Sequence, residues 1–346
     1  MTALPASYDA ILIVSFGGPE GPDDVIPFLE NVLRGKNVPR ERMLEVAEHY
    51  QHFGGVSPIN AQNRALIAAL ETELKQHGPA LPIYWGNRNW APYLTDTVRQ
   101  MADAGVKRAV AYFTSAFSSY SGCRQYRENV FAAQAAVGER APQIDKLRVF
   151  YNHPGFILPM IERVQSALDT IPAERRDATH LVFTAHSIPM SMASGCNYVT
   201  QLDEACRLVS NAFPQLANRL VYQSRSGPPT QPWLEPDVGD YLRGLAGHGV
   251  KDVVVIPIGF ISDHMEVMYD LDYEAKHIAE GLGMNVVRAG TVGTHPQFVS
   301  MIRELIAERM GLVSQKRFLG TLGPSHDVCP LDCCPAPQRP AGPPPR

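Results

Sequence analysis

The sequence predicts an α/β protein of two similar halves, each a parallel sheet flanked by helices, with a ligand cleft between them. Three observations lead to this class. Short apolar runs alternate with amphipathic stretches along the chain, as expected of buried parallel strands and the helices that cover them. The chain repeats its own pattern once. Its 346 residues, 45% of them hydrophobic, suffice for two medium-sized halves.

Each element follows from the local pattern. The expected strands are apolar runs bounded by turn residues, at 10–16, 82–85, 108–113, 147–151, 180–185, 219–223, 252–258 and 285–288. The expected helices are the amphipathic stretches at 23–33, 59–76, 93–104, 124–137, 156–170, 199–212, 238–246, 264–280 and 296–309. We expect a first half over 8–175, a second half over 176–312 and a tail over 313–346. The tail carries cysteines and is rich in proline, which favours disorder from residue 335 onward.

The repeat relates the first strand of each half. Residues 13–19 (IVSFGGP) can be laid over residues 183–189 (FTAHSIP), which pairs Phe16 with His186. Further on, a Trp precedes a Gly-Val-Lys turn by a similar distance in each half, Trp90 before 105–107 and Trp233 before 249–251. Any two doubly wound units share some features, but the Trp, the Gly-Val-Lys and the spacing together favour a duplication. Two Rossmann-like halves would then face each other with the carboxyl ends of their strands lining the cleft.

Composition and motifs exclude several function classes. The net charge of −4 and a pI near 6.3 do not indicate nucleic acid as a partner. The apolar run near the N-terminus lacks a basic flank and is too short for a signal peptide or a membrane span. We therefore expect a cytoplasmic protein with no stable membrane insertion. The glycines of Gly17-Gly18-Pro19 do not form a dinucleotide fingerprint, which disfavours nucleotide binding.

Titratable side chains follow two of the expected strands. His186 comes directly after residues 180–185, although a lone histidine there is also typical of a cap or a core position. After residues 252–258, Glu266, Asp270 and Glu274 recur every four residues, and His264 precedes them. On a helix these carboxylates share one face, either as a solvated acidic surface or as a site. Their place beside the cleft favours binding of a cation such as Fe²⁺ and transfer of protons.

Four segments carry a resemblance to a known family. Residues 183–190 read FTAHSIPM, and residues 260–266 read FISDHME, followed by Tyr269-Asp270-Leu271-Asp272. Residues 222–228 read YQSRSGP, with Pro-Trp-Leu at 232–234, and residues 53–59 read FGGVSPI. In the order in which they occur along the chain, these segments are similar to the signatures of the ferrochelatase family, and the similarity extends over roughly residues 8–312.

The resemblance implies the chelatase fold and a metal-insertion reaction in haem biosynthesis. In ferrochelatases the metal lies between the histidine and the glutamate that correspond to His186 and Glu266, where iron enters the porphyrin and two protons leave. Asp270, Glu274 and His264 would form the path for iron or protons. A cobalt or nickel tetrapyrrole chelatase and a non-catalytic haem or porphyrin carrier remain alternatives.

The resemblance also narrows the substrate. Phe16 stands where some relatives have a tyrosine or methionine able to ligate iron, and phenylalanine cannot do so. The stretch 35–43 is short and charged where membrane-attached members have an apolar lip, which favours coproporphyrin III over protoporphyrin IX. The expected substrate-binding residues are Phe16, Arg34, Ser57, Arg88, Tyr126 and Trp233. We expect a monomer whose product passes to a downstream haem-pathway enzyme.

Three of the six cysteines, Cys329, Cys333 and Cys334, lie together near the C-terminus. Some ferrochelatases hold a [2Fe–2S] cluster with three C-terminal cysteines and one internal cysteine, and thiolates close in sequence suit such a cluster. Cys196, in the loop beside His186, is the expected fourth ligand, with Cys123 as the second choice. Zinc, or no metal at all, remains an alternative.

Overall fold

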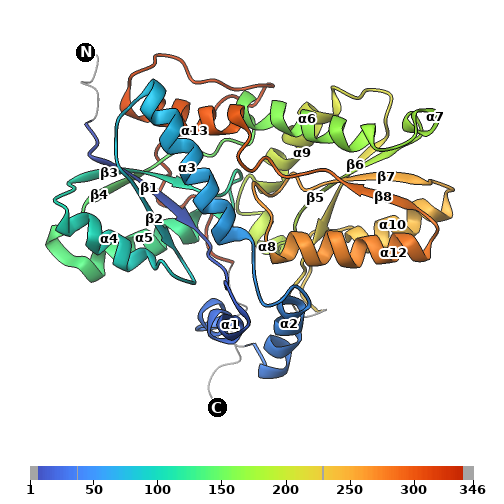
Figure 1. Cartoon of the computed structure of the whole chain (residues 1–346), viewed down its shortest axis with the longest axis horizontal. Helices are drawn as coiled ribbons and strands as arrows, with labels where there is room; N and C mark the ends of the chain where they lie inside the picture. The colour runs from blue at the N-terminus through green and yellow to red at the C-terminus, as the bar shows by residue number, and fades with distance from the viewer. Residues whose placement is uncertain (1–6, 37, 228–229, 338–346) are drawn as a thin grey trace.

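The computed structural model describes residues 7–36, 38–227 and 230–337, and it contains two parallel sheets side by side (Figure 1). The first sheet has the order β2-β1-β3-β4, with bounds Ala10–Ser15 (β1), Ile83–Asn87 (β2), Arg108–Phe113 (β3) and Gln143–Lys146 (β4). The second has the order β6-β5-β7-β8, with bounds His180–His186 (β5), Asn218–Gln223 (β6), Asp252–Ile256 (β7) and Asn285–Arg288 (β8). The predicted fold class is confirmed.

Helices cover both faces of each sheet. Those preceding β5 are α1 (Val25–Leu33), α2 (Arg40–His52), α3 (Ile59–His77), α4 (Leu94–Asp103), α5 (Gln125–Val137), α6 (Pro154–Asp169) and α7 (Ala173–Arg176). Those following β5 are α8 (Met190–Ala193), α9 (Tyr198–Ser210), α10 (Val238–Gly247), α11 (Met265–Val267), α12 (Lys276–Gly281) and α13 (Pro296–Met310). None of the helices in the described residues has both the length and the apolar composition needed to cross a membrane.

The core follows from the alternation of side chains along the strands. On β1, Leu12 and Val14 face α4 and α5, whereas Ile11 and Ile13 face a larger cluster. That cluster continues through α3, α6 and α13 to Phe183 on β5. The two halves therefore share one continuous core, which includes β1 and β5, the strands that lead to Phe16 and His186.

The two halves also repeat in detail. In the first half the amide of Asn87 donates to the carbonyl of Pro92 (2.7 Å), just before α4. In the second half the amide of Tyr222 donates to the carbonyl of Pro236 (2.9 Å), just before α10. With the matching strand orders, this shared connection supports the predicted duplication and makes β5 the counterpart of β1.

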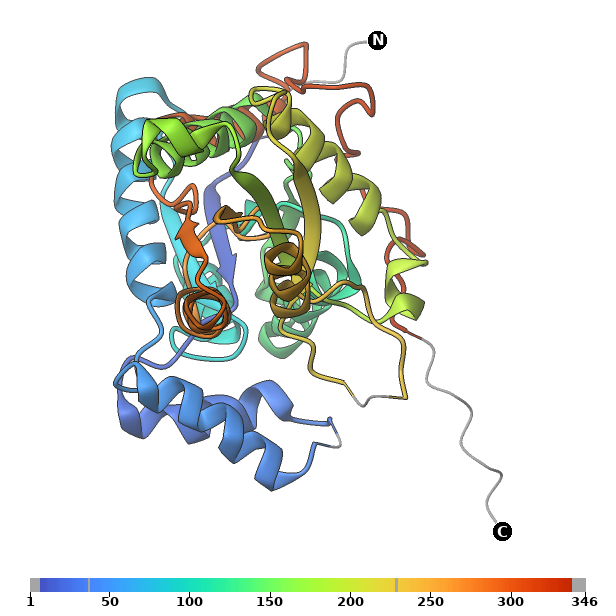
Figure 2. The same ribbon diagram turned by 90° about the vertical axis from the view of Figure 1, so that its right-hand side faces the viewer.

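Three elements differ from the sequence-based expectation. Residues 147–151 are largely buried but form no strand, because β4 ends at Lys146 and the chain then turns Arg148 toward α13. The charged stretch after residue 35 leads into a helix, α2, whose Met43 and Ala47 pack against Phe28. The predicted helix 264–280 is interrupted by a π-helical segment, η4 (Met268–Ala275), between α11 and α12. Figure 2 shows α1 and α2 as a separate layer beneath the sheets.

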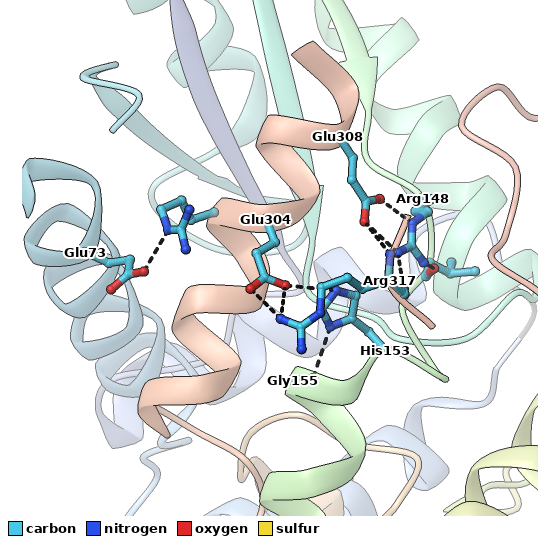
Figure 3. A network of polar contacts seen from close by, with 9 residues as sticks. Glu73, Arg148, His153, Gly155, Glu304, Glu308 and Arg317 are labelled. Carbon is cyan, nitrogen blue, oxygen red and sulfur yellow. Dashed lines mark hydrogen bonds and ion pairs between the residues drawn. The ribbon is translucent and has the colours of Figure 1, made fainter. Parts of the chain in front are cut away.

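Helix α13 fastens the tail and the first half together (Figure 3). Arg148 donates to both carboxylate oxygens of Glu308 (2.7 and 3.0 Å), and both side chains are buried, with exposed fractions of 1% and 3%. Glu304 accepts from Arg317 of the tail (2.7 and 2.9 Å) and lies 3.3 Å from His153 Nε2. Breaking a buried pair leaves an uncompensated charge, so these contacts fix the start of the tail. The end of the tail, residues 338–346, where we expect disorder, lies outside the described residues.

Candidate active site

The structure brings His186 and Glu266 together. His186 is the last residue of β5, and Glu266 lies in α11, shortly after β7. His186 Nε2 is 3.4 Å from one carboxylate oxygen of Glu266, and His264 Nδ1 is 4.0 Å from the other. The side chains of His186 and Glu266 are 32% and 47% exposed, so the pair is accessible to a ligand, and the backbone of His186 is anchored in the sheet.

The environment of His186 fixes the orientation of its ring. Its Nδ1 lies 2.5 Å from the carbonyl of Ser187 and its own carbonyl accepts from the Tyr198 hydroxyl (3.0 Å). A hydrogen bond at one ring nitrogen directs the other toward its partner. Nε2 therefore faces Glu266 and is the ring nitrogen available for a metal or a proton.

Electrostatic interactions shift the pKa values of both members of this pair. Burial alone would lower the pKa of His186, but the Glu266 carboxylate outweighs it and raises that pKa above its usual value. Burial would raise the pKa of Glu266, but His186, His264 and Lys36 together hold it well below its usual range. Burial lowers the pKa of His264. Glu266 thus favours the protonated form of His186, whereas the surroundings of His264 favour its neutral form.

The predicted acidic stripe continues along the π-helical segment. The Asp270 carboxylate accepts from the side chains of Gln223 (3.3 Å) and Ser224, both at the end of β6. Burial raises the pKa of Asp270 to about 7, with Glu266 and Glu274 adding to the shift although the Ser224 hydrogen bond opposes it. Glu274 lies further out and is exposed. Of the three carboxylates, Glu266 pairs with His186, Asp270 contacts the end of β6, and Glu274 is open to solvent.

The opposite wall comes from the first half. Phe16 directly follows β1, and its ring packs edge-on to Phe28 at 6.2 Å. The guanidinium of Arg88 lies 5.6 Å from the Phe16 ring and 4.4 Å from the Tyr126 ring. Its Nε donates to Asn129 (2.6 Å). Phe16, the counterpart of His186, presents an aromatic surface and no ligating atom.

The other predicted substrate residues lie in two kinds of environment. Arg34 is exposed and donates to Asn31 (2.5 Å). Ser57 is buried against Gly18, where a Cβ would lie 2.9 Å from the Ser57 hydroxyl. Trp233 is buried and covers Gly227. Arg34 therefore remains open to a ligand, whereas Ser57 and Trp233 form part of the supporting wall.

Two residues near Glu266 were not predicted. Lys36 follows α1, and desolvation by the surrounding protein, with Arg88 adding, lowers its pKa although Glu266 opposes the shift. Tyr50 on α2 packs against Phe28 at 5.8 Å, and burial, with Glu266 adding, raises its pKa. The charged stretch around Lys36 was visible in the sequence, but Tyr50 could be placed only once α2 was known.

The cysteines of the tail gather with His326 and with Cys123 of the first half. Cys333 Sγ lies 3.5 Å from Cys334 Sγ and 4.0 Å from His326 Nε2. The ligand atoms of His326, Cys329 and Cys333 all lie within 4.8 Å of one another. Cys123 is buried in the short π-helical segment Tyr120–Arg124, just before α5, and its side chain is hydrogen-bonded to Cys329. The tail thus meets the first half through cysteine side chains.

The chemistry of this group suits a soft metal centre. The hydrogen bond from Cys123 is the main cause that lowers the pKa of Cys329 to about 4, and His326 adds to it. The thiolate is the form that ligates metals. Cys196 is near Cys333 and Cys334, but its sulfur lies 3.3 Å from the Met192 carbonyl. Several sulfurs therefore converge here, with one already disposed to ionise.

Comparisons with known proteins agree with this geometry. The model of the ferrochelatase family matches residues 8–310. A ferrochelatase of Rhodopirellula baltica is 60% identical over 335 residues, which are 96% of this chain and 95% of that protein. Coproporphyrin III ferrochelatases of Streptomyces coelicolor and Mycolicibacterium smegmatis are 53% and 50% identical, over 95% and 91% of this chain and 94% and 93% of theirs.

A solved structure shares the architecture at low sequence identity. SirB from Bacillus subtilis, determined with Fe³⁺, is 14% identical and has a TM-score of 0.56 over 88% of this chain and 98% of that one. This likeness concerns the fold alone, whereas the family match and the relatives extend over nearly the whole sequence. The chain therefore belongs to the ferrochelatase family.

Proposed function

We propose that this enzyme inserts Fe²⁺ into coproporphyrin III, forming coprohaem and releasing two protons. The observation that carries the proposal is the pair of His186 and Glu266, 3.4 Å apart at the strand ends of the second half. Nε2 of His186 faces this pair and can ligate the iron or accept a pyrrole proton once its own proton has left. The aromatic surface of Phe16 would hold the other face of the ring.

Proton removal needs a route with groups that exchange protons near neutral pH. Each porphyrin N–H bond that breaks leaves its electron pair on nitrogen for the Fe–N bond, and its proton passes to His186 or Glu266. Asp270, with its pKa raised to about 7, is suited to receive that proton. The exposed Glu274 then releases it to solvent. Iron keeps its charge of +2 throughout, so no electron donor is required.

The cations of the cleft support coproporphyrin III, which has four carboxylates where protoporphyrin IX has two. Among the described residues, no carboxylate lies within ion-pair distance of Arg34, Lys36 or Arg88, and the two arginines donate to the amides of Asn31 and Asn129 instead. Arginine binds carboxylates strongly and often in bidentate fashion. Cations without a carboxylate partner at the mouth of a cleft are therefore suited to a polycarboxylate substrate.

Anaerobic insertion of Fe²⁺ into coproporphyrin III and protoporphyrin IX tests this function. We expect turnover with both, faster with coproporphyrin III, and loss of turnover in His186→Ala and Glu266→Gln. His180→Ala, at the other end of β5, and the exposed Glu280→Gln are matched controls. Unchanged rates in His186→Ala and Glu266→Gln would refute the mechanism, and faster use of protoporphyrin IX would refute the substrate. Insertion of Co²⁺ or Ni²⁺ but not Fe²⁺ would identify a different chelatase.

We also propose a [2Fe–2S] cluster in the cysteine group. Cys333 contacts Cys334, Cys123 is hydrogen-bonded to Cys329, and the sulfurs of Cys329 and Cys333 lie within 4.8 Å of each other, so four thiolates are available for a [2Fe–2S] cluster. This pairing favours Cys123 as the fourth ligand, in place of our sequence-based choice of Cys196. The cluster, when bound, would supply a cross-link between the tail and the first half.

Visible absorption and acid-labile sulfide of the purified protein test the cluster. We expect both in the wild type and in Cys196→Ser and Cys206→Ser, and their loss in Cys123→Ser and Cys329→Ser. Retention in Cys123→Ser with loss in Cys196→Ser would restore Cys196 as the ligand. Bound zinc without sulfide, or no metal, would contradict the cluster.

The location that we propose is the cytoplasm. All six cysteines lie in the described part of the chain and none of them is in a disulfide, as is usual in a reducing compartment. We expect the enzyme to act there as a monomer and to pass its product to a downstream enzyme of haem synthesis. Size-exclusion chromatography with light scattering tests the oligomeric state.

A further inference from the structure

A cavity of about 230 Å³ lies where the two halves meet, and none of the residues assigned to iron or porphyrin lines it. Its walls come from α3, α6, the segment before His264 and the segment before α13. The lining residues are Gln62, Asn63, Ala65, Leu66, Arg163, Ile261, Ser262, Gly293 and Thr294. The cavity thus joins elements from both halves and borders the loop that leads to the active site.

The only charged group in this lining is the guanidinium of Arg163. Its Nε is buried and has no hydrogen-bond partner. No Asp or Glu of the described residues lies within ion-pair distance of it, whereas Arg303, also at the junction of the halves, pairs with Glu73. A partly buried cation without a carboxylate partner is unfavourable, and an anion bound in the cavity would balance its charge.

Among the remaining polar side chains of the lining, those of Gln62, Ser262 and Thr294 can donate hydrogen bonds, whereas Asn63 already uses its NH₂ group to donate to Ser15 (2.6 Å). Gln62 uses its carbonyl oxygen to accept from the amide of Asp263 (2.9 Å), which leaves its NH₂ group as a donor. The hydroxyls of Ser262 and Thr294 also line the space. The stem of Arg163 passes Gly290, where a Cβ would lie 3.4 Å from Cδ, so the guanidinium is held in place by close packing.

A second cavity differs from this one in the charged groups that line it. The larger cavity of about 400 Å³ beneath α2 also contains an arginine, Arg42, but Glu45 and Glu48 line it together with His49 and His52. Arg42 donates to Glu45, so its charge is already matched. An anion would meet carboxylates in that cavity, whereas no carboxylate lines the cavity of Arg163.

We propose that the Arg163 cavity binds a small oxyanion such as phosphate, with Arg163 as the principal ligand and Gln62, Ser262 and Thr294 as further donors. The bound anion would bridge α3 and α6 next to the segment that positions His264 and Glu266. It would therefore stabilise the junction of the halves without entering the porphyrin cleft. Phosphate and a small dicarboxylate both offer oxygen acceptors, so separate titrations with each show which of the two anions the site binds.

Isothermal titration of the purified full-length enzyme with inorganic phosphate, and separately with succinate, at constant ionic strength tests the proposal. We expect one saturable site for at least one of them, and binding weakened about tenfold or more in Arg163→Gln, since hydrogen bonds to charged groups contribute that much. Arg99→Gln, an exposed arginine on α4 paired with Asp96, should bind as the wild type does. Arg163→Lys keeps the positive charge but lacks the paired N–H donors of the guanidinium, so this variant should bind the anion with intermediate affinity.

Two further measurements separate this site from the porphyrin cleft and from misfolding. Saturation with coproporphyrin III should leave the anion affinity unchanged, and the melting temperature should rise with the anion in the wild type but not in Arg163→Gln. Absence of saturable binding, equal binding in Arg163→Gln, or competition by the porphyrin would each overturn the proposal. It is independent of the proposed iron insertion, which can fail or succeed without it.

Discussion

The two walls of the cleft have the same backbone origin and opposite chemistry. In each half the central strand of the sheet ends at the cleft, β1 at Ser15 followed by Phe16 and β5 at His186. The second-half wall carries imidazoles and carboxylates in mutual contact, whereas the first-half wall carries aromatic rings and the cation of Arg88. Equivalent strand ends of the two halves thus carry titratable groups in one half and aromatic rings with an arginine in the other.

Because of this difference, we expect substitutions on the two walls to affect porphyrin binding and the rate of metal insertion separately. The cations near the first-half wall have amide partners in the free enzyme and can exchange them for substrate carboxylates. The titratable groups of the second-half wall already interact with one another. Substitutions on the first-half wall should therefore change the KM for porphyrin, and substitutions on the second-half wall should change kcat.

The largest expected effect is that of His186→Ala. Removing a positioned acid–base group costs about 10²–10⁴-fold in rate, and the loss of a metal ligand adds to it, so kcat should fall by about 10³-fold or more. Porphyrin affinity should change little, because under the proposed function His186 would face the ring centre and not the carboxylates. Stopped-flow insertion and fluorescence titration of the porphyrin measure the two quantities. A large loss of affinity with a preserved kcat would contradict the separation.

The next effect is that of Arg88→Gln on the opposite wall. Loss of a charge-assisted hydrogen bond costs about 1.5–3 kcal/mol, which corresponds to roughly a 10- to 100-fold rise in the KM for coproporphyrin III. We expect kcat to stay within a few-fold of the wild type. Steady-state kinetics at saturating iron, with Arg99→Gln as the control, distinguish this result from a drop in kcat.

A third effect concerns pH. Because burial lowers the pKa of His186 and Glu266 raises it, Glu266→Gln should bring that pKa down to or below the ordinary value of about 6.5. In the wild type the ring is protonated at neutral pH and loses its proton as the pH rises through the raised pKa; the stabilisation that it gains from Glu266 is lost over the same range. NMR titration of the His186 ring measures the shift. A pKa that is unchanged in Glu266→Gln would show that Glu266 is not its cause.

The smallest effect is expected for Phe16→Tyr. The new hydroxyl would face the porphyrin from the side opposite His186 and give the product iron a second protein ligand, with kcat within about threefold of the wild type. The absorption spectrum of enzyme-bound coprohaem should change while the insertion rate does not. An identical spectrum would show that the ring at this position does not reach the iron.

Much of this architecture could be predicted from the sequence because buried parallel strands leave a strong apolar signal. The strands over 108–113 and 285–288 lie where the pattern placed them, and the signature residues led directly to His186 and Glu266. The run 147–151 was predicted wrongly as a strand because it is equally apolar, but burial there comes from packing outside the sheet. An apolar pattern reports burial, and it does not show whether a strand has a neighbour to pair with.

Features that depend on tertiary contacts could not be predicted. Helix α2 buries only Met43 and Ala47, too few apolar residues for a clear helical period. The π-helical segment and the proximity of Lys36 and Tyr50 to Glu266 depend on how α1 and α2 lie over the cleft. The contact between Cys123 and Cys329 joins residues about two hundred positions apart, a separation that no local pattern can bridge.

The central claim is that chemistry belongs to the second-half wall alone, and a paired single-turnover measurement tests it most directly. The rate of Fe²⁺ insertion at saturating coproporphyrin III would be compared between His186→Ala and Phe16→Ala, which truncate equivalent positions of the two halves. The account predicts a loss of about 10³-fold or more in His186→Ala and a rate within about tenfold of the wild type in Phe16→Ala. Equal losses in the two variants would contradict it.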